Sequence, residues 1–206
     1  MKYIYTILLS TICLISYSQT EQIDDSSDEM SSSSYFGISL GLSVPGGGSM
    51  EAVNSGANLG FINFGYRFNE TWGATANLAS SGHSLDGEDL TFAFAYWGIG
   101  PMYTTKISEN TYWDIKPQLA LGMLGKYGDP NGSIIDGVEW NGSGFIIGNS
   151  FVFGNTKGLR FSIDIDYLSG NWDDISLGGV SFDTSAAGLD DSMSKFSLGL
   201  GLRYNF

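Results

Sequence analysis

The last thirteen residues, Ser194 to Phe206, constrain the fold of this chain more than any other stretch. Apolar and polar positions alternate strictly up to the final residue, and a period of two residues is the signature of a β-strand. The apolar face consists of Phe196, Leu198, Leu200, Leu202, Tyr204 and Phe206. Because this face ends in two aromatic residues, it is typical of a strand that faces lipid and places its aromatics at the membrane interface.

Seven earlier segments repeat this alternation, so the sequence predicts eight strands. Each runs for roughly 9 to 14 residues, which is long enough to cross a bilayer at a tilt. The expected strands are Tyr35–Val44, Asn58–Phe68, Trp72–Ser80, Leu90–Thr104, Tyr112–Met123, Gly142–Phe153, Leu159–Ser169 and Ser194–Phe206. Two strands depart from this pattern: Phe92 and Phe94 lie on the face opposite Trp97, and Asn149 shares the outward face of Phe145. In the fifth strand we expect Met123 to point outward and Gly122 inward.

The N-terminal residues have the features of an export signal followed by a polar tail. Lys2 precedes a short apolar run, and Ser16-Tyr17-Ser18 ends in the small residues of a cleavage site, so we expect a signal peptide over residues 1–18. The apolar run is shorter than the roughly 20 residues of a spanning helix. Residues 19–34 are acidic and rich in serine, and we expect them to be disordered.

Composition excludes several classes of function. The net charge of -13 argues against a nucleic-acid partner, because no basic surface is present to neutralise phosphates. Cys13 is the only cysteine and lies in the expected signal, so the mature chain has no disulfide and no thiol chemistry. We expect no cofactor.

The connections between the expected strands alternate between long and short. The long ones are residues 45–57, 81–89, 126–141 and 170–193. In membrane barrels the short turns are periplasmic and the long loops are external. The four long loops are therefore expected outside the cell, where they could engage an extracellular ligand.

Charged side chains fall on the inward face of the expected barrel. They are Arg67, Asp114, Lys116, Arg160, Asp164, Asp166, Lys195 and Arg203. An eight-stranded barrel is just wide enough for side chains to fill its interior. We therefore expect these charges to form a network that plugs the lumen, and the alternative is a narrow ion-selective channel.

The external loops contain one histidine and many carboxylates. His83, Ser84 and Asp86 are the residue types of a hydrolytic triad, which leaves a hydrolase acting on lipid A or peptides at the barrel rim as a further alternative. Adjacent loop residues rarely converge, and we expect His83 to be solvated. The carboxylates fit no spaced calcium-loop pattern, so we expect no metal site, although loose divalent-cation binding near lipopolysaccharide phosphates stays open.

The alternating strands and the final Tyr204 and Phe206 resemble the small eight-stranded outer-membrane β-barrels, the group that includes OmpX, the OmpA transmembrane domain and the "porin family" proteins. The resemblance covers about Tyr35 to Phe206. It implies an all-β, antiparallel up-and-down transmembrane barrel in the cell outer membrane, in contact with lipopolysaccharide. It also implies a final strand read by the barrel assembly machinery, and a role in adhesion, envelope integrity or immune evasion without enzymatic activity. Gln19, after the expected cleavage site, is similar to the mature start of exported proteins of Bacteroidetes-type bacteria. The alternative fold is a soluble lipocalin-like barrel, which would turn the apolar faces inward.

Overall fold

The computed structural model describes residues 33–129, 134–155 and 157–206, and the regular structure in them is β-strand throughout. The expected signal peptide and most of the acidic segment, residues 1–32, lie outside this part of the chain. The strands are β1 (Ser33–Gly48), β2 (Gly56–Arg67), β3 (Trp72–Ser84), β4 (Thr91–Ser108), β5 (Thr111–Gly128), β6 (Ile134–Phe153), β7 (Gly158–Leu177), β8 (Val180–Asp183) and β9 (Ser192–Asn205).

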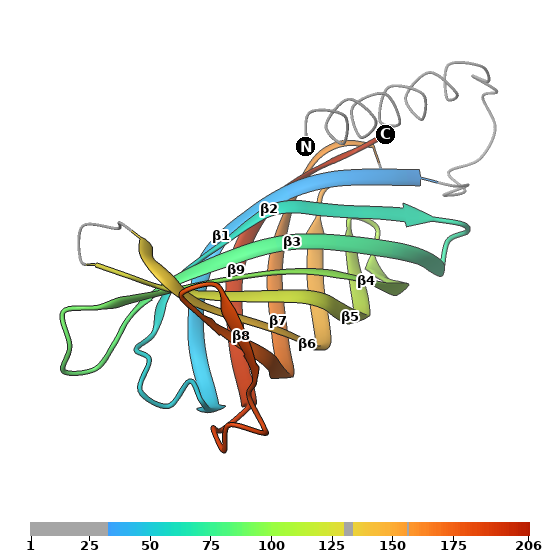
Figure 1. The fold of residues 1–206 in the computed structure, drawn as a ribbon. Helices are drawn as coiled ribbons and strands as arrows, with labels where there is room; N and C mark the ends of the chain where they lie inside the picture. Colours follow the sequence, from blue (N-terminus) through green and yellow to red (C-terminus); the bar gives the residue numbers. More distant parts are fainter. Residues whose placement is uncertain (1–32, 130–133, 156) are drawn as a thin grey trace, which may run out of the picture.

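Eight of these strands close into a ring of antiparallel neighbours (Figure 1). Consecutive strands from β1 to β7 pair side by side, β7 pairs with β9, and β9 returns to β1. Along this closing seam Tyr35 lies opposite Asn205 and Gly48 lies opposite Met193. The short β8 pairs only with the far end of β7 and lies outside the ring. The predicted eight-stranded up-and-down barrel is confirmed.

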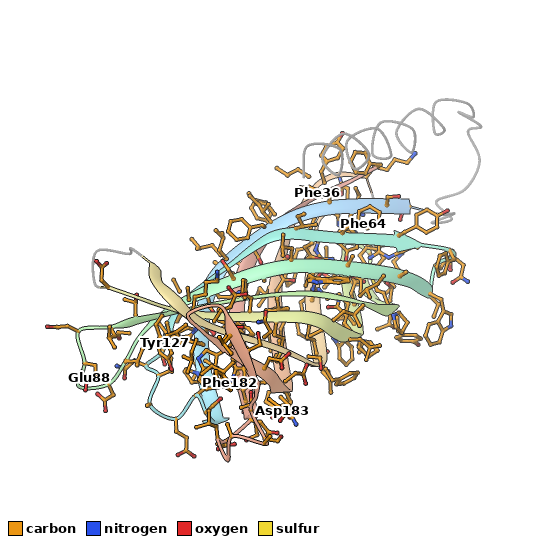
Figure 2. All side chains as sticks on the ribbon, in the orientation of Figure 1. Phe36, Phe64, Glu88, Tyr127, Phe182 and Asp183 are labelled. Atoms are coloured by element: carbon orange, nitrogen blue, oxygen red, sulfur yellow. The ribbon has the colours of Figure 1, made fainter. Side chains whose placement is uncertain are left out.

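The apolar faces of the strands point outward, as predicted for a transmembrane barrel. Figure 2 shows aromatic and aliphatic side chains on the outside of the wall, Phe36 among them. The exposed apolar side chains on the barrel wall include Phe36, Ile38, Leu40, Leu42, Phe61, Trp72, Trp97, Ile99, Leu119, Leu121, Phe145, Ile147, Phe161, Tyr167, Leu198, Leu200 and Leu202. A soluble lipocalin-like barrel would bury this face, so that alternative is wrong. Among the described residues no helix is long and apolar enough to cross a membrane.

β-bulges shift the alternation of inward and outward side chains, and the bulge in β5 corrects a predicted face. An extra residue at Phe61, between Gly60 and Ile62, places both Phe61 and Ile62 on the outer side of β2. In β5 the pairing skips from Ala120 to Met123, and Met123 turns inward with only 2% of its surface exposed. The prediction that Met123 points outward is therefore wrong, because one inserted residue reverses the face of every residue after it.

Several strands continue past the apolar belt into segments that the sequence indicated as loops. The β-structure includes Ser81–Ser84 at the end of β3, residues 126–128 and 134–141 of the β5–β6 hairpin, and residues 170–177 of β7. We call the barrel end that carries the connections after β1, β3, β5 and β7 the loop end, and the opposite end the turn end. Figure 2 shows Glu88, Phe182 and Asp183 at the loop end.

Candidate functional site: the barrel lumen and its outer mouth

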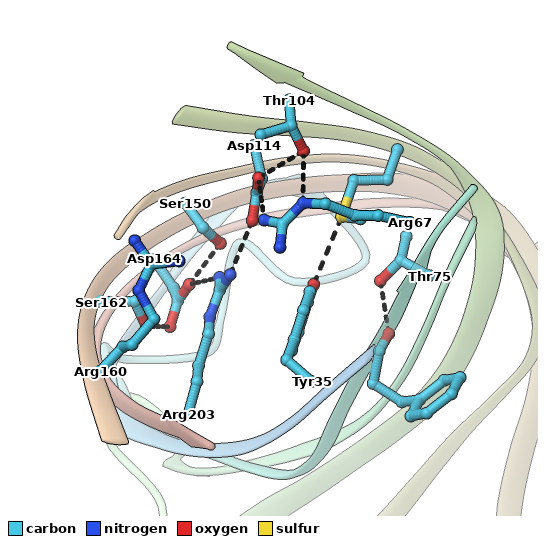
Figure 3. A network of polar contacts seen from close by, with 12 residues as sticks. Tyr35, Arg67, Thr75, Thr104, Asp114, Ser150, Arg160, Ser162, Asp164 and Arg203 are labelled. Atoms are coloured by element: carbon cyan, nitrogen blue, oxygen red, sulfur yellow. Dashed lines mark hydrogen bonds and ion pairs between the residues drawn. The ribbon is translucent and has the colours of Figure 1, made fainter. Parts of the chain in front are cut away.

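The turn-end half of the lumen is filled by a buried cluster of opposite charges (Figure 3). Asp114 on β5 forms ion pairs with two arginines. Arg67 Nη2 lies 2.9 Å from its Oδ1, and Arg203 Nη1 lies 2.7 Å from its Oδ2. Arg203 Nη2 also reaches Asp164 Oδ1 at 3.2 Å. Thr104 donates to Asp114 Oδ1 at 2.8 Å and accepts from Arg67 Nε at 3.0 Å. Four of the eight predicted lumen charges thus meet in one cluster that joins β2, β5, β7 and β9.

Aromatic rings face the cations that this cluster does not fully neutralise. The Arg203 guanidinium lies 4.5 Å from the centre of the Tyr35 ring, and Arg160 lies 4.5 Å from the centre of the Tyr112 ring. Arg160 Nη2 also donates to the carbonyl oxygen of Gly154 at 3.2 Å. Cations over aromatic faces are attracted by the ring quadrupole. The surplus of positive charge on the inner face is therefore met partly by tyrosine rings.

The other three predicted lumen charges lie nearer the loop end. They form no ion pair within 4.0 Å among the described residues. Lys116 is buried on β5, and Asp166 lies on the same inner side of β7. Lys195 Nζ donates to Ser81 Oγ at 3.0 Å and to Asn58 Oδ1 at 3.3 Å. It also lies 4.7 Å from the centre of the Phe94 ring.

Apolar side chains fill much of the loop-end half of the lumen, which the sequence did not indicate. A cluster of buried side chains fills it, made of Met50, Ala79, Phe92, Phe94, Tyr96, Ala120, Met123, Ile146, Leu168, Trp172 and Met193. The one available signal was the first half of β4, where Phe92 and Phe94 alternate with Ala93 and Ala95 on the face opposite Trp97. The ion cluster around Asp114 thus occupies the turn-end half, and this apolar cluster lies in the loop-end half.

His83 is buried on β3 and is not a solvated loop residue. Only 3% of its surface is exposed, and both ring nitrogens have partners: Asn54 O lies 2.8 Å from Nδ1, and Ser81 Oγ lies 2.9 Å from Nε2. Since a carbonyl oxygen only accepts, Nδ1 carries the proton and Nε2 accepts from Ser81, whose hydroxyl in turn accepts from Lys195. Burial is the largest cause that lowers the pKa of His83, and the charge of Lys195 adds to it, while the hydrogen bond to Asn54 O opposes the shift.

The residues of the hydrolase alternative do not assemble around His83. Ser84 is exposed and its hydroxyl oxygen accepts from Asn54 Nδ2 at 3.3 Å, whereas His83 turns to Ser81 on the inner face of β3. Asp86 is exposed in the following loop. Adjacent strand residues point to opposite faces, which separates Ser84 from the His83 ring.

A cavity of about 210 Å³ lies at the loop end, next to the apolar cluster. Its lining residues are Ser49, Met50, Val53, Phe92, Tyr127, Trp140, Trp172, Leu189 and Asp190. Four of these are aromatic, and the Trp172 indole is held by its Nε1–H, which donates to Ser49 Oγ at 2.8 Å. Among the described residues no group of three or more histidine, cysteine or acidic side chains could hold a metal ion.

The outward apolar belt and the closed ring of strands define a transmembrane β-barrel with a filled interior. Its fold is that of the small outer-membrane β-barrel proteins. No protein-family model matches the sequence, and no curated protein sequence matches it significantly.

Three solved structures of this kind are similar to the chain. The outer membrane protein OprG from Pseudomonas aeruginosa has a TM-score of 0.54 at 13% identity, over 86% of this chain and 97% of OprG. Ail, the attachment invasion locus protein of Yersinia pestis, has a TM-score of 0.51 at 16% identity, over 86% of this chain and all of Ail. Neisserial surface protein A has a TM-score of 0.51 at 13% identity, over 85% and 96%. At these identities the similarity establishes the shared fold alone.

Proposed function

We propose that this chain is a non-enzymatic integral outer-membrane protein that does not conduct ions and that interacts, through its loop end, with a partner outside the cell. The observation that carries the proposal is that two groups of buried side chains occupy the lumen, one in each half of the barrel. The ion cluster around Asp114 fills one half, and the aromatic and methionine cluster around Phe94 fills the other. A permeant ion would have to displace both a buried network of charges and a layer of packed apolar side chains.

The strand lengths support a surface role. β6 and β7 each contain 20 residues, whereas 9 to 11 are enough to cross a bilayer. At roughly 3.3 Å per residue, the surplus of about nine residues extends on the order of 30 Å along the strand beyond the membrane. The loop end therefore presents a paired sheet, with β8 attached, rather than a set of short turns.

The charge of the loop end narrows the chemistry of the partner. Lys126 is the one lysine or arginine in the four long connections, and it pairs with Glu139 at 2.7 Å. The acidic residues there are Glu51, Asp86, Glu88, Asp89, Asp129, Asp136, Glu139, Asp173, Asp174, Asp183, Asp190 and Asp191. The Ail structure holds sucrose octasulfate, a heparin analogue. An acidic loop end disfavours such polyanions, so we expect a basic partner, or lipopolysaccharide phosphate bridged by divalent cations.

The final strand is proposed as the signal for the barrel assembly machinery. Tyr204 and Phe206 pack edge to face with ring centres 5.2 Å apart on the outer wall. The backbone N–H of Phe206 donates to Ser34 O at 2.9 Å, which ties the last residue to β1. Deletion of Phe206 is expected to lower assembly in the outer membrane.

Two measurements on the full chain test the proposal. In planar bilayers the refolded barrel should insert without discrete current steps, and reproducible steps would replace the proposal with the channel alternative. The second measurement compares the adhesion of cells that carry the protein to immobilised basic protein and to immobilised heparin. A variant in which a two-residue turn replaces residues 173–190, and so joins Trp172 to the neighbouring Asp191, should insert normally and bind the basic surface less well. Equal binding by both chains, or preference for heparin, would contradict a role for the acidic loop end.

A further inference from the structure

The cavity at the loop end has walls that are mostly aromatic. Four rings form a continuous series, with centres 5.3 Å apart from Tyr127 to Phe92, 6.3 Å from Phe92 to Trp172, and 5.9 Å from Trp172 to Trp140. Successive rings are inclined by 57°, 87° and 54°. The rings therefore meet at an angle or edge to face and do not form a flat stack, and all four line the cavity.

A carboxylate completes the lining. Asp190 lies on the cavity, and its Oδ1 accepts hydrogen bonds from Ser192 N at 3.1 Å and from Ser192 Oγ at 2.8 Å. Both bonds use the same oxygen, and among the described residues Oδ2 makes no hydrogen bond. Asp190 is thus held in place with one oxygen left to a ligand.

Size and charge select the ligand class. A cavity of about 150 Å³ in another protein binds benzene, so about 210 Å³ admits a trimethylammonium group on a short chain. Aromatic faces attract cations, and cages of such faces bind quaternary ammonium groups. An anion would meet Asp190 and the other acidic residues of the loop end.

We propose that this cavity binds a quaternary ammonium group, through the rings of Tyr127, Phe92, Trp140 and Trp172 and the carboxylate of Asp190. The site goes beyond the proposed surface interaction, because it takes a small ligand into a cavity of the loop end and does not need a macromolecular partner on its surface. The same chemistry can come from a free small cation such as choline or from a phosphocholine headgroup.

The experiment is a titration of the full refolded barrel with choline in a maltoside detergent, since phosphocholine detergents would compete. Binding is measured by calorimetry and by tryptophan fluorescence, to which Trp140 and Trp172 in the cavity wall contribute. The neutral control is 3,3-dimethylbutan-1-ol, which has the shape of choline without its charge. We expect choline to bind at least tenfold more tightly than this alcohol. Equal affinities, or no binding of choline at 50 mM, would overturn the proposal.

Variants locate the binding to the cavity. Trp140→Leu keeps an apolar wall and removes a ring, and it should weaken choline binding about tenfold. Asp190→Asn keeps the oxygen that accepts from Ser192 and should weaken binding severalfold, whereas Asp86→Asn, outside the cavity, should change nothing. If Trp140→Leu does not fold, Tyr127→Leu takes its place. Unchanged affinity in the folded cavity variants would overturn the site.

Phosphocholine distinguishes the two sources of the ligand. Tighter binding of phosphocholine than of choline supports the site and identifies a lipid headgroup as its source. Weaker binding, as repulsion between phosphate and Asp190 would cause, supports the site with a free cation as its source. Failure of the surface-binding experiment leaves this result unaffected, because the titration uses the isolated barrel.

Discussion

Arg203 on the last strand forms an ion pair with Asp114 on β5 across the lumen, with 2.7 Å between Nη1 and Oδ2 and both side chains fully buried. β7 and β6 separate the two strands in the ring, so no backbone pairing brings these residues together. The pair therefore cross-links strands of the barrel wall from the inside. Asp114 is the centre of the cluster, because it also forms an ion pair with Arg67.

Replacement Asp114→Asn should destabilise the barrel strongly. The amide keeps the shape of the carboxylate but leaves Arg67 and Arg203 buried with less opposite charge, and breaking such a pair from one side costs about 3–5 kcal/mol. Urea unfolding from lipid vesicles should show this loss in the free energy of unfolding. The exposed Asp86→Asn serves as the control, with an expected change below about 0.5 kcal/mol. Equal unfolding midpoints for the two variants would mean that the cluster does not hold the wall.

Gly41→Ala should impair closure of the barrel between β1 and β9. Gly41 lies opposite Gly199, and a methyl group at position 41 would overlap the backbone carbonyl of Leu198. Because the obstacle is the backbone of β9 and not a movable side chain, relief requires the strands to separate, at a cost of about 2 kcal/mol or more. Gly82→Ala is the matched control, since no heavy atom lies within 4 Å of its added carbon. Heat-modifiability on gels and urea unfolding should separate the two variants, and identical behaviour would refute the steric argument.

The mouth of the barrel should loosen as the pH falls. The pKa of His83 is lowered in the folded state, mainly by burial, from an ordinary value of 6.5. The opened form therefore binds more protons than the closed form below about pH 6.5, and the free energy of local opening decreases as the pH falls through this range. Hydrogen-exchange protection at residues 54–56 and 81–85 should drop on going from pH 7.5 to 5.5.

The variant His83→Gln provides the control for this pH effect. A glutamine does not titrate in this range, so the drop in protection at the same amides between pH 7.5 and 5.5 should become smaller. A wild-type protein whose protection stays constant across this interval would show that His83 accepts a second proton without opening the mouth.

Period-two alternation was enough to predict the wall of the barrel but not the side chains that fill the loop-end half of its lumen. In β9 and β7 one face is apolar and the other carries charges. In a membrane barrel the apolar face must contact lipid, so the charged face must point into the lumen. In the first half of β4 the opposite face holds Ala93 and Ala95, and such small residues do not reveal which side faces lipid. At Met123 a bulge reversed the alternation, and an inserted residue has no mark in the sequence.

The position of His83 could not be predicted for a different reason. Ser81-Gly82-His83-Ser84 has the composition of a loop, and its strand conformation comes from pairing with β4, where His83 lies opposite Phe92. Its burial also depends on Asn54, which is 29 residues away in the chain. Contacts of this range are tertiary, and they override local preference.

The two levels of the lumen should close the barrel independently. Arg203→Ser opens a path through the ion cluster, but the layer around Phe94 remains, and Phe94→Ala with Trp172→Ala opens that layer while the ion cluster remains. Each variant alone should therefore give no current steps in planar bilayers, and only their combination should conduct. Leu200→Ala on the lipid-facing wall should stay silent in either background. Current through Arg203→Ser alone would show that the apolar layer admits water, and silence in the folded combined variant would show that further side chains, Lys116 and Lys195 first, close the lumen.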